Sequence, residues 1–70
     1  MTAKYHVGVY DIAGEFDFAK CEDFAGCLKV AAEMRAKYPQ KVVQVSNLDR
    51  CDYDTNGLTA DERDQLDEVL

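Results

Sequence analysis

Residues 21–39, CEDFAGCLKVAAEMRAKYP, decide the fold of this 70-residue chain, because they carry its clearest secondary-structure signal. At 3.6 residues per turn, apolar side chains gather on one side of a helix, at Phe24, Cys27, Leu28, Ala31, Met34 and Tyr38. Lys29, Glu33 and Lys37 fall on the opposite side. This pattern predicts an amphipathic helix from about Glu22 to Tyr38 that lies on a sheet. Pro39 ends it, since the residue before a proline avoids the α region.

The segment before this helix predicts a β-hairpin. Residues 4–12, KYHVGVYDI, are rich in β-favouring types and partly alternate between apolar and other residues. Residues 15–18, EFDF, alternate cleanly, and Gly14 marks the turn between the two strands. The alternation places Phe16 and Phe18 on one face, and we expect both to be buried.

The segment after the helix predicts one more strand and a short C-terminal helix. Residues 41–45, KVVQV, read as a strand with Val43 and Val45 on one face. Residues 59–70, TADERDQLDEVL, read as a helix, because Thr59 and Glu62 form the capping-box pattern. The order strand–strand–helix–strand–helix predicts one α+β domain over residues 1–70, with a small antiparallel or mixed three-stranded sheet packed on the longer helix. The expected core consists of Phe16, Phe18, Phe24, Leu28, Ala31, Val43 and Val45.

Several classes of protein are not supported by the composition. Three cysteines with no CxxC pair predict reduced, at least partly buried thiols rather than a disulfide scaffold, at Cys21, Cys27 and Cys51. The first residues lack a signal-peptide pattern, and no apolar run approaches the roughly 18 residues of a membrane span, so we expect a cytoplasmic protein without membrane contacts, in the host cytoplasm if a phage encodes it. The only histidine, His6, and the only serine, Ser46, fit no catalytic or zinc pattern. We therefore expect neither enzymatic activity nor a cofactor.

The net charge of −6 lies entirely in the last third of the chain. Residues 1–46 contain six acidic and six basic side chains, whereas residues 47–70 contain eight acidic side chains against Arg50 and Arg63. Direct binding of nucleic acid requires a basic surface, so this layout argues against it. It predicts instead an acidic surface that meets another protein.

The acidic part begins with a stretch, residues 52–63, that is similar to half of a calcium-binding loop. Asp52, Asp54 and Asn56 occupy the first three side-chain positions of the EF-hand or dockerin-type pattern, with Gly57 at its turn. Arg63 stands where a bidentate glutamate belongs. The pattern leaves two interpretations: a weak calcium site, or a turn that leads into a capped helix. The capping signals favour the turn, because Asp and Asn side chains bond to their own backbone and Gly accepts positive φ.

The predicted C-terminal helix carries four acidic residues in a stripe opposite Leu66, Val69 and Leu70: Asp61, Asp64, Asp67 and Glu68. Carboxylates three or four residues apart repel by about 0.2–0.5 kcal/mol per pair, and the last two also oppose the helix dipole. The stripe is either a solvated face that keeps a small protein soluble or a surface that meets Lys and Arg. With the acids of the loop it would form one negative face, and the predicted partner-binding residues are Asp49, Asp52, Asp54, Asp61, Asp64, Asp67 and Glu68.

In size, acidity and concentration of charge at one end, the chain resembles the small anti-CRISPR proteins and other DNA-mimic inhibitors of bacteriophages. The resemblance covers the whole chain but rests on charge layout rather than on a motif. It implies an inhibitor that occupies the basic nucleic-acid-binding surface of a larger protein and excludes DNA, with association steered by charge. Two alternatives stay open: a weak calcium-binding module, and a non-inhibitory adaptor subunit that docks through its C-terminal helix.

Overall fold

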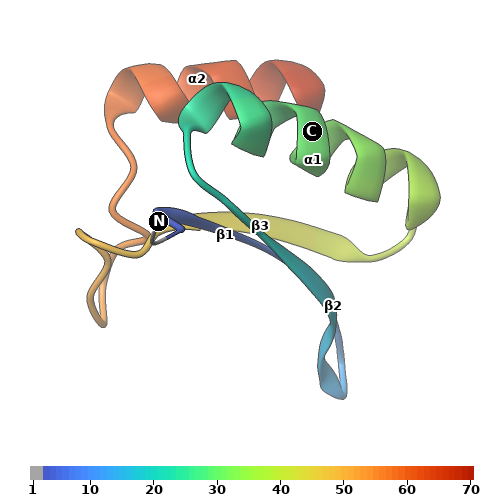
Figure 1. Ribbon diagram of the computed structural model, residues 1–70. Helices are drawn as coiled ribbons and strands as arrows, with labels where there is room; N and C mark the ends of the chain where they lie inside the picture. The colour runs from blue at the N-terminus through green and yellow to red at the C-terminus, as the bar shows by residue number, and fades with distance from the viewer. Residues whose placement is uncertain (1–2) are drawn as a thin grey trace.

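The computed structural model describes residues 3–70 and has the predicted order of elements (Figure 1). These elements are β1 (Tyr5–Asp11), β2 (Gly14–Cys21), α1 (Phe24–Lys37), β3 (Val42–Asn47) and α2 (Ala60–Val69). β1 is the central strand, and both of its neighbours run antiparallel to it. The predicted α+β fold is therefore confirmed, and the sheet is antiparallel rather than mixed.

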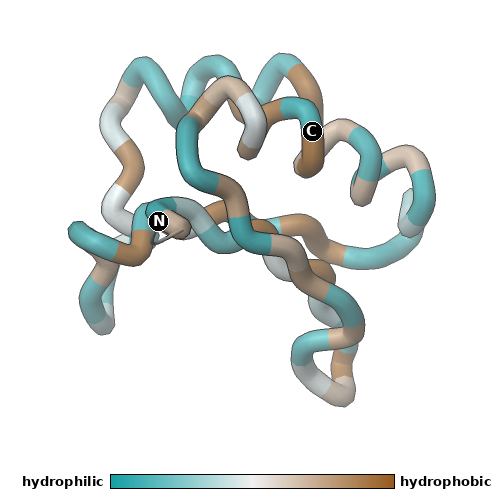
Figure 2. The backbone as a smooth tube through the Cα atoms, in the orientation of Figure 1, coloured by the Kyte–Doolittle hydropathy of each residue, from teal (hydrophilic) through white to brown (hydrophobic). Residues whose placement is uncertain are grey.

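Both helices lie over the same face of the sheet, and the other face is uncovered (Figure 1). Hydrophilic colours dominate the helix turns that point away from the sheet (Figure 2). α1 packs on all three strands, whereas α2 packs on α1. The buried apolar residues between these layers are Tyr5, Val7, Val9, Cys27, Ala31, Val43, Val45 and Leu66. Burying one valine or leucine side chain is worth about 1.5–3 kcal/mol, so this small set holds the fold together.

The predicted burial of two phenylalanines is wrong. Phe16 and Phe18 are 56% and 54% exposed. The pairing of β1 with β2 shifts between Val9 and Tyr10, so that Phe16 has no partner in β1. Such a bulge breaks the two-residue alternation from which a shared face was inferred.

The bulge sends the two aromatic rings to different places. The Phe16 ring lies edge-on to Tyr38, at the end of α1, with 5.3 Å between ring centroids. The Phe18 ring stands opposite Gly8 and stacks on His6, with 5.6 Å between centroids, on the uncovered face. The core below the helices is filled instead by every second residue of β1, Tyr5, Val7 and Val9. Of the other predicted core residues, Ala31, Val43 and Val45 are buried, and Phe24 and Leu28 pack partly buried against them.

The ends of α1 are set by the residues just outside it. Asp23 is the N-cap, and its carboxylate accepts a hydrogen bond from the Gly26 N–H at 2.7 Å. The helix therefore begins two residues later than the predicted start at Glu22. Tyr38 is the C-cap and precedes Pro39, as the sequence predicts.

The three cysteines are free thiols, but they differ in exposure. Cys27 belongs to α1 and is buried, and burial raises the pKa of its thiol to about 12, with Cys21 and Glu62 adding to the shift. Cys21 is half-buried. Cys51 is exposed, so its predicted burial is wrong: it lies in the loop after β3, where its backbone N–H donates to the Asn47 carbonyl at 2.9 Å and its thiol to the Leu48 carbonyl at 4.0 Å.

Candidate functional site: the acidic loop and helix

The acidic loop, residues 48–59, is anchored at both ends by Asn47. This residue is 1% exposed, and its N–H donates to the Asn56 carbonyl at 2.8 Å. Its own carbonyl accepts from Arg50 and Cys51, and its side-chain oxygen accepts from the Asp49 N–H at 3.0 Å. One buried residue, mainly through its backbone N–H and carbonyl, thus fixes where the loop leaves β3 and where it returns. The sequence shows no local signal for this role except that Asn47 continues the buried alternation of Val43 and Val45.

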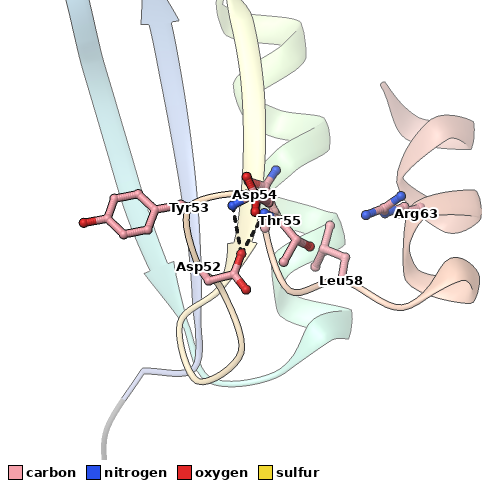
Figure 3. A pocket seen from close by; sticks show the side chains of 7 residues that line it. Asp52, Tyr53, Asp54, Thr55, Leu58 and Arg63 are labelled. Atoms are coloured by element: carbon pink, nitrogen blue, oxygen red, sulfur yellow. Dashed lines mark hydrogen bonds between the residues drawn. The ribbon is translucent and has the colours of Figure 1, made fainter.

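The half of the loop that is similar to a calcium site folds as a hydrogen-bonded turn. The Asp52 carboxylate accepts from the N–H groups of Asp54 and Thr55, at 2.8 and 3.1 Å (Figure 3). Gly57 has φ 77°, and a Cβ there would lie 2.7 Å from the Arg50 carbonyl carbon. These are the contacts of the turn that the sequence predicts, since an Asp side chain here bonds its own backbone and only Gly fits the close approach.

The same turn offers little to a calcium ion. Asp52 Oδ1 is occupied by two backbone donors. Arg63 reaches from α2 toward the loop and lines the same hollow of about 400 Å³ as Asp52 and Asp54 (Figure 3). A guanidinium at that place repels a cation. Within residues 3–70, no three His, Cys, Asp or Glu side chains come close enough together to hold a metal ion.

The start of α2 is held by the predicted capping box. The Glu62 N–H donates to the Thr59 hydroxyl at 3.2 Å, and the Thr59 N–H donates to Glu62 Oε1 at 2.9 Å. The second oxygen of Glu62 accepts a hydrogen bond from the Tyr5 hydroxyl at 2.7 Å. This contact between residues 57 positions apart ties α2 to β1, and the sequence does not reveal it.

The contact between Tyr5 and Glu62 changes the pKa of both groups. Burial raises the pKa of Tyr5 to about 12, and the hydrogen bond to Glu62 adds to the shift. Burial also raises the pKa of the Glu62 carboxyl, but hydrogen bonds from Thr59 and Tyr5 outweigh it and hold that pKa below its usual value. Glu62 is therefore a charged structural residue of the fold and is not available to a partner.

The seven predicted partner-binding residues are all exposed: Asp49, Asp52, Asp54, Asp61, Asp64, Asp67 and Glu68. We call this set the acidic surface. On α2, Leu66 points inward at 6% exposure, so that Asp61, Asp64 and Glu68 lie on the outer side of the helix. Asp67 lies on its flank and lines a hollow of about 260 Å³ between α2 and β3. The last turn of α2 contains no basic residue to offset these charges.

Arg63 lies close to two parts of the acidic surface. Its side chain lines both the hollow that contains Asp52 and Asp54 and the hollow that contains Asp67. One positive charge therefore lies beside acids of both the loop and the helix. The position of Arg63 between them depends on how the loop folds back along α2, for which the sequence contains no signal.

The residues of the acidic surface form none of the ion pairs in the described part of the chain. In the described part of the chain there are two ion pairs, His6 with Glu15 at 3.5 Å and Lys41 with Asp11 at 3.2 Å, and both lie outside residues 47–70. Carboxylates three and four positions apart on α2 repel one another, and Arg63 is the one basic residue of that helix. Chemically, the arrangement can attract cationic groups.

Comparisons with known proteins identify no relative: no protein family, no curated protein and no solved structure matches the chain. Over residues 3–70, neither helix has the length and apolar character needed to cross a membrane.

Proposed function

We propose that this chain is a protein-interaction module whose acidic surface binds a Lys- and Arg-rich surface of a larger protein. The favoured target is a nucleic-acid-binding site, and the favoured outcome is inhibition by DNA mimicry, as in anti-CRISPR proteins. The observation that carries the proposal is that seven exposed carboxylates, and with them the whole net charge of −6, gather in residues 47–70 without an ion-pair partner in the described chain.

The energetic cost of this arrangement supports a binding role. Asp67 and Glu68 lie at the end of α2 where the helix dipole disfavours negative charge, and no lysine or arginine in that turn offsets it. A basic partner removes both the dipole penalty and the mutual repulsion when it binds. The free chain therefore holds a small destabilisation that favours association.

The density of charge on α2 is comparable to that of a nucleic-acid strand. Four exposed carboxylates from Asp61 to Glu68 extend over about 10 Å of helix, because each residue rises about 1.5 Å. One strand of B-DNA carries a phosphate about every 3.4 Å along its axis. A channel of Lys and Arg side chains that binds a phosphate backbone therefore meets a similar number of charges on α2.

A displacement assay tests the proposal. Fluorescently labelled duplex DNA is bound to each of a panel of basic nucleic-acid-binding effectors, CRISPR nucleases among them, and the chain is titrated in. We expect the chain to release the DNA from at least one effector at a stoichiometry near one to one. Displacement from none of them, or a DNA release that is equal for every basic protein, would contradict a specific DNA-mimic function.

A further inference from the structure

β3 leaves part of its outer edge without a hydrogen-bonding partner. In an antiparallel pair, the residues of one strand alternate between bonding the neighbouring strand and pointing away from it. The Asn47 N–H points away from β1 and donates to the Asn56 carbonyl at 2.8 Å. The alternation turns the N–H and carbonyl groups of Val43 and Val45 the same way. Neither valine has a further backbone partner there within residues 3–70, so these groups form a free edge.

This free edge lies beside an apolar hollow. α2 packs on α1 rather than on β3, and β3 and α2 run in opposite directions (Figure 1). The hollow of about 260 Å³ between them is lined by Val43 and Val45 and by three leucines, Leu58, Leu66 and Leu70. We call this hollow, together with the free edge, the β3–α2 groove. It offers backbone partners and an apolar pocket side by side, as required by an extended peptide that adds a strand to a sheet.

The opposite edge of the sheet, along β2, is less suited to an added strand. The Phe18 N–H points outward on that edge and already donates to the Asp17 carboxylate at 2.8 Å. The pairing of β2 is also interrupted by the bulge beside Val9 and Tyr10. Bulges twist a sheet edge and disfavour further pairing. An added strand is therefore expected at β3.

The two ends of the β3–α2 groove differ. The hydrogen bond between Asn47 and Asn56 closes the edge at the end of β3, next to the start of α2. Arg63, near the start of α2, lines the hollow and forms no ion pair within residues 3–70. A guanidinium carries donors that match a carboxylate. Asp67 lines the same hollow, and four residues of helix place it about 6 Å further along α2.

We propose that the β3–α2 groove binds the C-terminal segment of a partner protein as an added β-strand. The segment runs parallel to β3, so that its terminal carboxylate reaches the closed end and pairs with Arg63. Its last side chain, opposite Val45, is apolar and enters the hollow beside Leu66. Two residues of strand span about 6.6 Å, close to the rise from Arg63 to Asp67. A Lys or Arg two positions before the end therefore pairs with Asp67.

The charge of the chain favours this occupant over a second copy. Pairing of two β3 edges would bring together two α2 helices, each with Asp64, Asp67 and Glu68 exposed, and like charges repel. A peptide with a basic residue is attracted instead. The proposal goes beyond the function proposed above and does not depend on it, because the groove shares only Asp67 with the acidic surface.

Binding of synthetic hexapeptides to the full chain tests the proposal. Fluorescently labelled peptides that permute Val, Leu, Thr and Lys over all positions are prepared with a free carboxylate and, in parallel, with a C-terminal amide. Fluorescence anisotropy should find the tightest binding for peptides that end in Val or Leu and carry Lys two positions earlier. Amidation should weaken these peptides about tenfold, because it removes the charge-assisted bond to Arg63. A peptide set without any preference for the free carboxylate overturns the proposal.

Two pairs of variants locate the site. Arg63→Gln should abolish the preference for the free carboxylate, whereas Lys29→Gln, the same loss of charge on the exposed side of α1, should keep it. Leu70→Lys should weaken binding about fivefold or more, because Leu70 lines the hollow. Val69→Lys is its control, since Val69 is 36% exposed and Leu70 39%, and it should change binding little. Amide spectra verify that each variant is folded. A preference that survives Arg63→Gln contradicts the proposed pairing.

Amide hydrogen exchange tests the added strand itself. The N–H groups of Val43 and Val45 should exchange quickly in the free chain and become protected when the peptide binds. The Lys20 N–H, on the outer edge of β2, should exchange quickly in both states. Peptide binding without protection of the two valines rules out the added strand. Protection that appears without peptide as the chain is concentrated would show that a second copy occupies the edge, against the proposal.

Discussion

At the scale of single residues, Glu62 is the acidic side chain of residues 47–70 that is partly buried and joins two elements of the fold. One of its carboxylate oxygens completes the capping box with Thr59, and the other accepts from Tyr5. The remaining seven are exposed. A count of charges in the sequence therefore overstates the charge available to a partner by one, and the difference depends on a contact between distant parts of the chain.

This assignment predicts the effect of replacing Glu62. Glu62→Ala removes the reciprocal cap and leaves the Tyr5 hydroxyl without its acceptor, so the free energy of unfolding should fall by about 1–2 kcal/mol. Glu62→Gln keeps one oxygen to accept from the Thr59 N–H, and its amide NH₂ can donate to the Tyr5 hydroxyl oxygen, so it should lose less. Urea denaturation measures both, with the exposed Gln65→Ala as a control that should change stability by less than about 0.5 kcal/mol. Equal losses for Ala and Gln would show that charge rather than hydrogen bonding matters at this position.

The raised pKa of Tyr5 predicts a loss of stability in alkali. The folded chain ionises Tyr5 near pH 12, whereas the ordinary pKa is 10.0, so the unfolded chain releases this proton first as the pH rises. The contribution of Tyr5 is complete below pH 10.0 and is lost as the pH rises toward 12. The stability of the wild type should therefore decrease relative to that of Tyr5→Phe across this window in urea denaturation. Parallel curves for the two proteins would contradict the shift.

At the scale of elements, the parts that could be predicted are those specified by local signals. α1 follows from its apolar side and Pro39, and the start of α2 follows from Thr59 and Glu62. The failures come from non-local structure. The bulge opposite Val9 and Tyr10 separates Phe16 from Phe18, and pairing between strands, rather than the sequence of either strand, determines it. The anchoring role of Asn47 and the position of Arg63 between the acidic groups likewise depend on how the loop folds back on α2.

The loop element predicts that calcium leaves stability unchanged. Asp52 is used by the backbone of the turn, and Arg63 faces the place where the last ligand would stand. An ion present at 100 times its dissociation constant would add about 2.7 kcal/mol to the free energy of unfolding, which a thermal melt detects easily. The melting midpoint in calcium should equal that in chelator. A higher midpoint in calcium at micromolar concentration would establish the site that we consider disfavoured.

The α2 element predicts a variant that is more stable but binds less well. Glu68→Lys places a positive charge at the end of the helix where the dipole favours it and removes repulsion from Asp64, four positions earlier, so stability should rise by about 0.3–1 kcal/mol. The same change removes one charge of the acidic surface, and affinity for a basic partner should fall. Glu33→Lys, on the exposed side of α1 away from its end, is the matched control and should alter neither property by as much. A Glu68→Lys chain that is less stable than the wild type would show that the acidic residues support the helix.

At the scale of the whole molecule, the net charge lies in the loop after β3 and in α2, whereas residues 1–46, which form the sheet and α1 almost completely, are neutral. This layout explains why the fold tolerates a concentrated charge. The acids repel one another at the surface of the last 24 residues, while the core under α1 is built from residues of the neutral part and one leucine of α2. Association through the acidic surface then depends on long-range attraction rather than on an apolar patch. Changes to the acidic surface should therefore act mainly on the association rate constant.

That expectation leads to a test with two variants of equal charge. Asp64→Lys with Glu68→Lys alters the acidic surface, whereas Glu22→Lys with Glu33→Lys alters two exposed residues that make no ion pair or hydrogen bond in the described chain. Asp23 is unsuitable for the control, because it caps α1.

Against a partner found by DNA displacement, the first variant should lower the association rate constant strongly and the second only slightly. The affinity of the wild type should fall steeply as salt shortens the screening length to about 8–10 Å and below. Equal losses for both variants would show that only the net charge matters, and no loss for either would leave the acidic surface as a solvated face and end the inhibitor proposal.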